Sequence, residues 1–385
     1  MWRTATSGRW PSVTSPRGLR LLVVHPGASW STHDVFVGLA TALVAAGVDV
    51  RTYPLDSRIT YAATWLAHCA AQERKQGREV ADPTPPEIFF EAGADIISRA
   101  AVLQVDAVLI ISAMYVPLAI MRALRQLRCP VGLVLTESPY DDDEQVKWAA
   151  LADIVWTNER TSVEVLREAN AETYYLPAAY NPAVHTSEPQ PGDEDVPAHD
   201  VLFVGTGFPE RVELLEAVEW TGIDLGLYGN WESLRDDSPL RPFVRDGVTD
   251  NARAAALYRR ATIGLNLYRT SKGFEGKGHI ARAESLNPRA YELAACGCFR
   301  VEGFRMEAAS VFGTGVIYDN PYYRMTDAAG LEFAIKHYLA RPAERDCVRQ
   351  RDVAAVRRHT FDARAAHLLA EFAPIIDRQY AAAYG

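Results

Sequence analysis

Residues 19–53, LRLLVVHPGASWSTHDVFVGLATALVAAGVDVRTY, contain the pattern that decides the fold of this chain. The run at residues 19–24 is short and mostly apolar, which is typical of a strand buried in a parallel sheet. A loop at residues 25–32 precedes an apolar-patterned segment at residues 34–46, for which we expect a helix. A second short run at residues 48–53 predicts another strand. These residues therefore predict one strand–helix–strand unit.

The same alternation of strands and helices continues along the first half of the chain. We expect further strands at residues 106–112, 131–136 and 154–157, and helices at residues 117–127 and 161–169. Strands that alternate with helices imply a parallel sheet with helices on both of its faces.

The composition changes at residues 181–199, where four prolines and several acidic or amide residues leave little apolar surface to bury. We interpret this segment as a linker between two domains. The alternation then restarts, with strands expected at 201–204, 225–228, 263–267, 299–301 and 315–318, and helices at 210–219, 252–260, 289–295, 327–339, 345–358 and 362–380.

The predicted fold class is α/β, with two doubly wound Rossmann-like domains that face each other across a cleft. The first domain covers residues 18–180, and the second covers residues 200–360. Residues 1–17 are expected to form a mobile leader, and a terminal helix at 361–385 is expected to return to the first domain. A chain of 385 residues exceeds the usual size of a single domain, which agrees with this division.

The composition is that of an ordinary globular protein and limits the function. With 48% apolar and 23% charged residues, the chain is not disordered, and no stretch is long and apolar enough to span a membrane. Its start lacks the apolar core of a secretory signal, so we expect a cytoplasmic protein. The net charge of −9 argues against a broad nucleic-acid surface but leaves room for a local basic groove. The five cysteines lack metal-ligand spacing, so we expect reduced, mostly buried thiols.

The first candidate site follows the strand at 201–204. In doubly wound sheets, ligands bind beyond the carboxyl ends of the strands, where helix N-termini face anions. Gly205 and Gly207 let the backbone approach a phosphate closely, and Arg211 is placed to pair with a diphosphate. The alternative is a plain tight turn with a solvated arginine. The spacing matches neither the dinucleotide fingerprint nor a P-loop, which disfavours dinucleotide and ATP chemistry.

The second candidate site is the start of the helix expected at 289–295. Asn287 before a proline is a good N-cap, which places Ser285, Asn287 and Arg289 at a helix N-terminus that welcomes a phosphate. Glu292 lies one turn further, where a carboxylate suits the two hydroxyls of a ribose. The alternative is a surface ion pair between Glu292 and Arg289. We favour a ligand, because the residues that follow Glu292 are apolar and a carboxylate in a buried helix needs a partner.

In the first domain, two pairs of residues follow predicted strands and are expected to line the opposite side of the cleft. His33 and Asp34, at the start of the first helix, are candidates to orient an acceptor hydroxyl or to act as a base. Their alternative roles are an exposed loop position for His33 and helix capping for Asp34. Glu137 and Tyr140 are expected on the acceptor side. The acidic run at 141–144 has the spacing of a metal-binding Asp-x-Asp, but we interpret it as negative charge at a helix start.

The segment from Glu284 to Glu292, followed by Leu-Ala-Ala-Cys-Gly, resembles the motif of two glutamates separated by seven residues in group-1 glycosyltransferases. The Ser285-x-Asn287-x-Arg289-x-x-Glu292 form is most similar to their CgeB-like, spore-maturation branch. Other matching segments occur in the same order: Phe203-Val204-Gly205 with Arg211, Tyr228-Gly229, Leu265-Asn266-Leu267 and His359–Arg364.

The resemblance implies the GT-B fold and a second domain that binds a nucleoside-diphosphate sugar, such as a UDP-sugar. Glu292 would hold the ribose, and Glu284 would lie near the donor sugar. The remaining donor-side residues would be Gly205, Gly207, Arg211, Tyr228, Asn266, Ser285, Asn287 and Arg289. The group generally retains the anomeric configuration and uses neither metal nor cofactor, because basic side chains neutralise the leaving diphosphate. The family's separate lysine has no clear counterpart, since Lys272 and Lys277 stand in an upstream Gly-rich loop.

Two other functions stay open at the level of sequence. One is a phage-type DNA glycosyltransferase that acts on a hydroxymethylated base, and the other is a protein that binds nucleotide sugars without catalysis. The acceptor is a glycan, a small molecule or a modified DNA base. The first-domain loops at residues 56–86, which are expected to choose it, show no recognisable motif.

Overall fold

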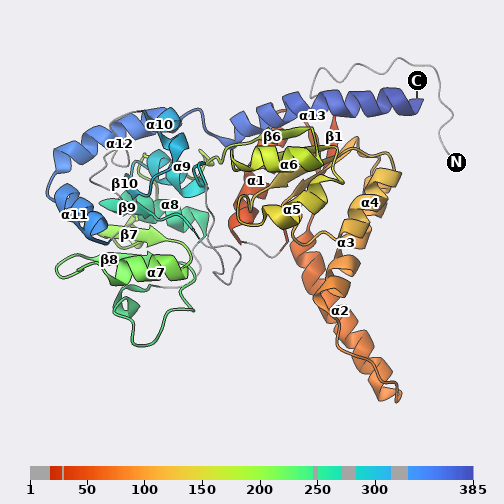
Figure 1. The fold of residues 1–385 in the computed structure, drawn as a ribbon, viewed down its shortest axis with the longest axis horizontal. Helices are drawn as coiled ribbons and strands as arrows, with labels where there is room; N and C mark the ends of the chain where they lie inside the picture. Colours follow the sequence, from red (N-terminus) through yellow and green to blue (C-terminus); the bar gives the residue numbers. More distant parts are fainter. Residues whose placement is uncertain (1–17, 28–29, 246–249, 271–282, 314–327, 385) are drawn as a thin grey trace.

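The computed structural model describes residues 18–27, 30–245, 250–270, 283–313 and 328–384. It contains two parallel sheets, each belonging to one half of the chain and covered by helices (Figure 1). This is the predicted α/β class with two Rossmann-like domains. The predicted leader at residues 1–17 and the predicted strand at 315–318 lie outside the described residues.

The first sheet has six parallel strands. In spatial order they are β2 (Asp49–Tyr53), β1 (Arg20–Val24), β3 (Ala107–Ile111), β4 (Val131–Leu135), β5 (Ile154–Thr157) and β6 (Thr173–Tyr175). Along β1, Leu21 and Val23 pack into one core, and Leu22 and Val24 pack into another. Because successive side chains point to opposite faces, both faces of this sheet are buried. The apolar run that predicted β1 is explained by this double burial.

The helices of the first half are α1 (Trp30–Ala45), α2 (Leu55–Lys75), α3 (Pro85–Val102), α4 (Leu118–Gln126), α5 (Asp142–Ala149) and α6 (Ser162–Ala169). The helix α1 begins four residues before its predicted start. Asp34 therefore lies inside α1 and cannot be its N-cap, which removes the structural alternative considered for this residue.

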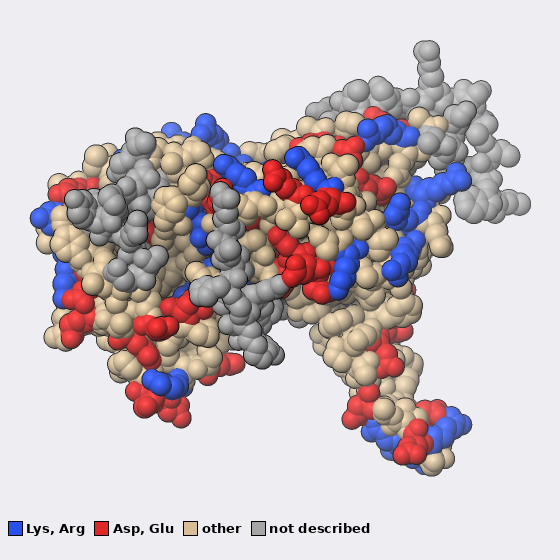
Figure 2. All heavy atoms as spheres, viewed as in Figure 1, with Lys and Arg blue, Asp and Glu red and all other residues tan. Residues whose placement is uncertain are grey.

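The expected loops at residues 56–86 are mostly helix, and that prediction was wrong. Residues up to Lys75 belong to α2, which pairs with α3 and projects from the body of the molecule (Figures 1 and 2). The two helices share a narrow apolar seam that includes Ala62 and Ile96. Helix-forming residues without breakers continue to the end of α2, so no loop is needed until that point. Tyr61 and Trp65 are exposed on this arm.

The second sheet has four described parallel strands, in the order β10 (Phe299–Glu302), β9 (Ile263–Asn266), β7 (Val201–Val204) and β8 (Leu225–Tyr228). Its helices are α7 (Pro209–Glu216), α8 (Asn251–Arg260), α9 (Pro288–Ala295), α10 (Met306–Phe312), α11 (Ala328–Leu339) and α12 (Pro342–Val356). Short 3-10 turns occur at Asp193–Asp195 and Arg241–Phe243. Among the described residues, α10 and β6 are the shortest α-helix and the shortest strand, and neither was predicted from the sequence.

The last helix, α13 (Phe361–Tyr384), leaves the second half of the chain and lies against the first domain (Figure 1). Its buried face, which includes Phe361, Leu368 and Phe372, joins the same core as Leu39 of α1 and Trp156 of β5. The rings of Phe372 and Trp156 meet edge to face, with their centroids 5.6 Å apart. The predicted return of the terminal helix to the first domain is therefore confirmed.

The segment between the two sheets is more ordered and more buried than its composition suggests. His185 and His199 are only 2% and 5% exposed. Asp193 accepts two hydrogen bonds from Arg259 of α8, at 2.7 and 2.8 Å. This ion pair fixes the segment to the second domain.

All five cysteines are free, as expected. Cys296 and Cys298 are buried, Cys69 and Cys129 are partly buried, and Cys347 is exposed. The expectation of mostly buried thiols therefore fails for Cys347, which lies on the solvent side of α12.

Candidate active site

The N-terminus of α9 is built on a network of amide side chains. Asn287 caps the helix, and its side-chain oxygen accepts a hydrogen bond from the backbone N–H of Ala290. Asn266, at the end of β9, exchanges two hydrogen bonds with the Asn287 side chain, at 2.9 and 3.0 Å. Asn266 also donates to Glu302 at 2.9 Å and is fully buried. The end of β9 thus fixes the position of the α9 cap.

Two arginines lie at the carboxyl end of β7. The guanidinium of Arg289 lies over the ring of Phe203, 4.8 Å from its centroid, and that of Arg211 lies 5.4 Å from the same centroid. Arg211 also lies over Phe208 at 4.9 Å and donates to the carbonyl of Thr206. Both guanidiniums are therefore held by aromatic faces and carbonyl or amide oxygens.

Gly205 makes room for this arrangement. A Cβ at position 205 would stand 2.4 Å from a terminal nitrogen of Arg289. Gly207 is close-packed for another reason, because a Cβ there would stand 2.5 Å from the ring of Trp231. The missing side chain at Gly205 therefore leaves space for the Arg289 guanidinium, whereas that at Gly207 allows Trp231 to pack within the second domain.

The charge of this arginine pair is offset at longer range within the described residues, by Glu210 for Arg211 and by Glu292 for Arg289. Among the described residues, no carboxylate lies within 4.0 Å of the Arg211 or Arg289 guanidinium. The Nε atom of each arginine is buried without a hydrogen-bond partner. Burial and the positive charge of Arg289 lower the pKa of Arg211 to about 9. A buried, unpaired guanidinium is unfavourable unless an anion binds to it.

Arg269, just after β9, adds a third guanidinium and meets the first domain. It lies over Phe208 at 4.8 Å and over Tyr140 at 4.6 Å, and its carbonyl accepts a hydrogen bond from the Tyr140 hydroxyl at 2.9 Å. Its guanidinium lies 3.9 Å from Glu137. The two residues predicted on the acceptor side, Glu137 and Tyr140, thus contact the donor-side domain directly.

Asp34 of the first domain lies close enough to Glu292 of the second for their charges to interact. Glu292 is partly buried, and burial raises its pKa to about 7, against the opposing effect of Arg289. Burial, which is the larger effect, and the negative charge of Glu292 together raise the pKa of Asp34 to about 6. The alternative considered for Glu292 was a surface ion pair with Arg289. Among the described residues, the two side chains form no ion pair within 4.0 Å.

His33 is exposed, and its Nδ1 lies 2.8 Å from Nε2 of the buried His25. The two rings also contact Phe36, and Nδ1 of His25 lies 3.7 Å from Asp56 at the base of the projecting arm. His33 therefore lies in α1 and not in the exposed loop position considered as its alternative, although its side chain is exposed. The hydrogen bond with His25 fixes its ring.

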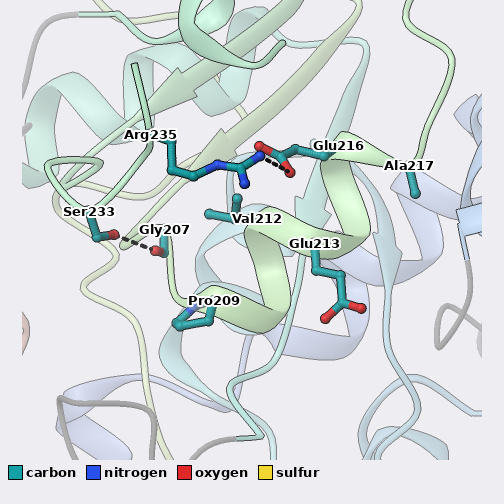
Figure 3. A pocket seen from close by; sticks show the side chains of 8 residues that line it. All are labelled: Gly207, Pro209, Val212, Glu213, Glu216, Ala217, Ser233 and Arg235. Atoms are coloured by element: carbon teal, nitrogen blue, oxygen red, sulfur yellow. Dashed lines mark hydrogen bonds and ion pairs between the residues drawn. The ribbon is translucent and has the colours of Figure 1, made fainter. Parts of the chain in front are cut away.

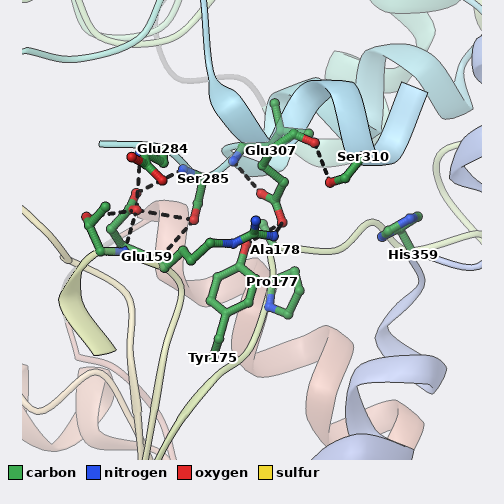
Figure 4. A network of polar contacts seen from close by, with 12 residues as sticks. Glu159, Tyr175, Pro177, Ala178, Glu284, Ser285, Glu307, Ser310 and His359 are labelled. Carbon is green, nitrogen blue, oxygen red and sulfur yellow. Dashed lines mark hydrogen bonds and ion pairs between the residues drawn. The ribbon is translucent and has the colours of Figure 1, made fainter. Parts of the chain in front are cut away.

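Glu284 and Ser285 lie at the boundary between the domains (Figure 4). Their backbone N–H groups donate to Glu159 of the first domain, each at 3.1 Å. The Ser285 hydroxyl donates a hydrogen bond to Glu159 and accepts one from the backbone N–H of Arg160. Ser285 thus joins the domains in this structure.

Tyr228 does not lie with the other predicted donor residues. It is 1% exposed, and its hydroxyl is hydrogen-bonded to His199 at 3.0 Å. The structure brings together Gly205, Arg211, Asn266, Asn287 and Arg289, whereas the Tyr228 side chain belongs to the core beside α8.

An open pocket of about 520 Å³ lies beside α7 (Figure 3). Its lining includes Gly207, Glu213 and Glu216, and Arg235 lies 3.9 Å from Glu216. Gly207 is the single predicted site residue in this lining. Its carboxylates make the pocket unsuited to a diphosphate, so we do not assign the donor to it.

The acidic run at 141–144 begins α5, as predicted. Asp142, Asp143 and Glu144 occupy its first turn, where carboxylates are stabilised by the helix dipole. Asp142 accepts hydrogen bonds from Ser162 and Gln145, and Glu144 pairs with Lys147. Of the residues described, no three His, Cys, Asp or Glu side chains are grouped so as to hold a metal ion.

The sequence analysis missed Glu159, Arg269 and the two phenylalanines beneath the arginines. A sequence signal existed for Phe203 and Phe208, because they flank Gly205 and Gly207. Arg269 stands three residues after Asn266, just past the end of β9, where ligands are expected. Glu159 follows β5 by two residues, but its contacts with Glu284 and Ser285 join residues more than a hundred positions apart, which no local pattern indicates.

The comparisons with known proteins agree with this geometry. Residues 211–370 match a family model described as glycosyl transferase-like. The spore protein CgeB of Bacillus subtilis (strain 168) is 25% identical over 231 residues, which cover 58% of this chain and 71% of that protein.

Solved structures share the fold over nearly the whole chain. Sucrose-phosphate synthase from Thermosynechococcus elongatus superposes with a TM-score of 0.60 at 16% identity, over 95% of this chain and all of that one. A trehalose-6-phosphate protein from E. coli, bound with UDP-2-fluoro glucose, superposes with a TM-score of 0.57 at 14% identity, over 92% and 99% of the two chains.

The fold and these matches define the class that the chain resembles: it has the GT-B architecture of the solved glycosyltransferase structures. Residues 211–370, which include Arg211 of α7 and the whole of α9, match the glycosyl transferase-like family model. Among curated proteins, the chain is similar to the CgeB spore protein. No helix in the described ranges has the length and apolar character needed to cross a membrane.

Proposed function

We propose that the protein transfers a sugar from a nucleoside-diphosphate sugar to an acceptor hydroxyl, with retention of configuration and without a metal ion. The observation that carries this proposal is the pair of guanidiniums of Arg211, which is buried, and Arg289, which is partly buried. Among the described residues no carboxylate lies within 4.0 Å of either. A diphosphate supplies the missing charge. Charge-assisted hydrogen bonds from two arginines stabilise the leaving group as its bond to the sugar breaks.

Glu292 is proposed to hold the ribose of the donor. It follows Arg289 by almost one turn of α9, so its carboxylate lies on the same side of the helix as the proposed diphosphate site. A carboxylate that accepts hydrogen bonds from two adjacent hydroxyls regains the partners that burial removed. The nucleotide bound by the E. coli structural neighbour supports a UDP-sugar as the first donor to test.

Asp34 and His33 are proposed to act on the acceptor. Asp34 comes from the first domain and lies near Glu292 and hence near the proposed donor. With a pKa of about 6, Asp34 is ionised at neutral pH and can accept a hydrogen bond or a proton from an acceptor hydroxyl. Glu284, which precedes α9, is proposed to lie near the donor sugar.

The face shown in Figure 2 carries Lys and Arg side chains interspersed with Asp and Glu. A duplex-binding surface needs a basic patch or stripe. We therefore propose a carbohydrate or small-molecule hydroxyl as the acceptor, in preference to a modified DNA base.

Glu292→Gln tests the donor site. We expect donor binding to weaken by about tenfold or more, because the neutral amide is a poorer acceptor for two ribose hydroxyls. Isothermal titration with UDP, GDP and their sugars measures this effect. Glu213→Gln, on the exposed side of α7, serves as the matched control and should bind as wild type does. Equal donor affinity in Glu292→Gln and wild type would falsify the assigned role.

The stereochemical outcome and the metal requirement are tested on the wild type. Proton NMR of the freshly formed product should show the anomeric configuration of the donor. The transfer rate should be the same in a chelator as in added Mg²⁺, because guanidiniums carry the charge of the leaving group. An inverted product, or a rate abolished by the chelator, contradicts the corresponding part of the proposal.

A further inference from the structure

Glu159 is a first-domain carboxylate that is buried against the second domain. It follows β5 by two residues, and its side chain is 3% exposed. Within its own domain it accepts hydrogen bonds from the N–H and the hydroxyl of Thr161, both at 3.0 Å. From the other domain it accepts the N–H groups of Glu284 and Ser285, both at 3.1 Å, and the Ser285 hydroxyl at 3.3 Å.

The second domain also places a carboxylate at this boundary, that of Glu307 at the start of α10 (Figure 4). Glu307 accepts hydrogen bonds from the Tyr175 hydroxyl of the first domain and from the N–H of Leu286, the latter at 2.7 Å. It also lies 3.5 Å from the Arg160 guanidinium. The backbone of residues 284–286 therefore donates hydrogen bonds to one carboxylate from each domain, Glu159 and Glu307.

Within the described ranges, no Lys, Arg or His nitrogen lies within 4.0 Å of the Glu159 carboxylate. Its charge is met by N–H and O–H donors alone, and three of these five belong to the second domain. If the domains separate, Glu159 loses these three donors together. These three contacts of Glu159 thus form only while the domains are joined, and charge-assisted hydrogen bonds of this kind are strong.

Residues 284–286 directly precede the proposed donor site in the chain. Ser285 stands two residues before Asn287, the cap of α9, and α9 carries Arg289 and Glu292. We propose that Glu159 is a positioning residue that couples the joining of the domains to the geometry of the donor site. This inference rests on the proposed function, and Glu159 itself touches neither donor nor acceptor.

Glu159→Gln and Glu159→Ala test this coupling, with Glu164→Gln on the exposed face of α6 as the matched control. We expect kcat for sugar transfer to fall at least about tenfold in Glu159→Ala, and less in Glu159→Gln, which keeps one carbonyl acceptor. The KM for donor should change by less than about threefold, because the arginines and Glu292 remain in place. Glu164→Gln should match wild type in both constants.

Small-angle X-ray scattering measures domain separation without any ligand or turnover. We expect a larger radius of gyration for Glu159→Ala than for wild type and Glu164→Gln. An unchanged radius together with unchanged kcat overturns the proposal. A fall in kcat that accompanies a lower melting temperature and an unchanged radius also overturns it, because that result indicates a structural role only. If wild type transfers no sugar, the proposed function fails, and the scattering comparison alone then decides whether Glu159 joins the domains.

Discussion

The chemistry of this protein depends on a few charged side chains that the fold has taken out of water. Arg211 and Glu292 both show the effect of burial on charge: the pKa of the guanidinium falls to about 9, and that of the carboxylate rises to about 7. Burial disfavours the charged form of either group. Both shifts are relieved when a ligand supplies the missing hydrogen bonds or opposite charge, which is the behaviour expected of a binding site.

The pKa of Glu292 predicts how donor affinity depends on pH. A raised carboxylate pKa means that Glu292 is mostly protonated at pH 6 and mostly ionised at pH 8. The ionised form is the one proposed to accept hydrogen bonds from the ribose, so we expect UDP to bind up to about tenfold more tightly at pH 8 than at pH 6. Titrating UDP across this range measures the effect.

The control for this prediction is Glu292→Gln, in which the pH dependence of UDP binding should flatten. If the variant keeps the full pH dependence, the titrating group is another one, of which Asp34, with a pKa of about 6, is the nearest described candidate.

At the scale of elements, the site consists of strand ends that meet helix starts. The β9 end holds the α9 cap through Asn266 and Asn287, and the turn after β7 leaves space for Arg289 at Gly205. The eight-residue helix α9 therefore does not set the direction of Arg289 by itself. Its neighbours on both sides do so, which is why short, well-capped elements suffice here.

Gly205→Ala tests this dependence of α9 on the neighbouring turn. The new methyl group would overlap the guanidinium of Arg289, a flexible side-chain end that can move. The positive φ of 158° at this position is strained for any L residue, so the stability of the fold should fall by about 1–3 kcal/mol. The displaced guanidinium should weaken UDP binding by about tenfold and leave the binding of uridine unchanged. Calorimetric titration with the two ligands separates these effects.

Gly93→Ala is the control for this variant, because its added methyl group meets its neighbours only at 3.5 Å or beyond. Equal losses of UDP and uridine affinity in Gly205→Ala would show that the turn, and not Arg289, had been disturbed.

At the scale of the whole molecule, the chain crosses between its domains twice. The first crossing is the segment after Tyr180, and the second leads into α13, next to the bridge between Tyr180 and Thr360. The two crossings lie side by side, so the domains are joined at one place by the backbone and elsewhere by side chains such as Glu159 and Tyr140. Such a connection allows the domains to move as units while α13 stays with the first.

Phe372→Ala tests whether α13 is an integral part of the first domain. Phe372 is fully buried against Trp156 and Gly132, so its truncation should lower the free energy of unfolding by about 3–5 kcal/mol. Denaturant unfolding monitored by tryptophan fluorescence measures this loss. Ala370→Ser, on the exposed side of α13, should leave stability unchanged. A loss below about 1 kcal/mol in Phe372→Ala would mean that α13 is only loosely attached.

Much of the fold and part of the candidate site could be predicted from local sequence patterns. The buried strands were recognisable because parallel strands covered on both faces are short apolar runs, as in β1 and β7. The α9 start was recognisable because Asn287 followed by proline is a local capping signal. The prediction failed for the segment after β2, where the helical arm of α2 and α3 replaces the expected loops, and for the first residues of α1. The start of α3 does carry a local signal, because Thr84 and Glu87 form a capping box, and that signal was missed.

The sequence by itself determined the order of strands and helices, the double burial of the sheets and the residues that cap α9, because each depends on near neighbours in the chain. Only the tertiary structure decided that Glu159 accepts hydrogen bonds from the Glu284–Ser285 backbone, that Tyr228 turns into the core and that Asp34 lies close enough to Glu292 for their charges to interact. These contacts join residues far apart in sequence. They depend on how two separately folded domains meet, which no local pattern encodes.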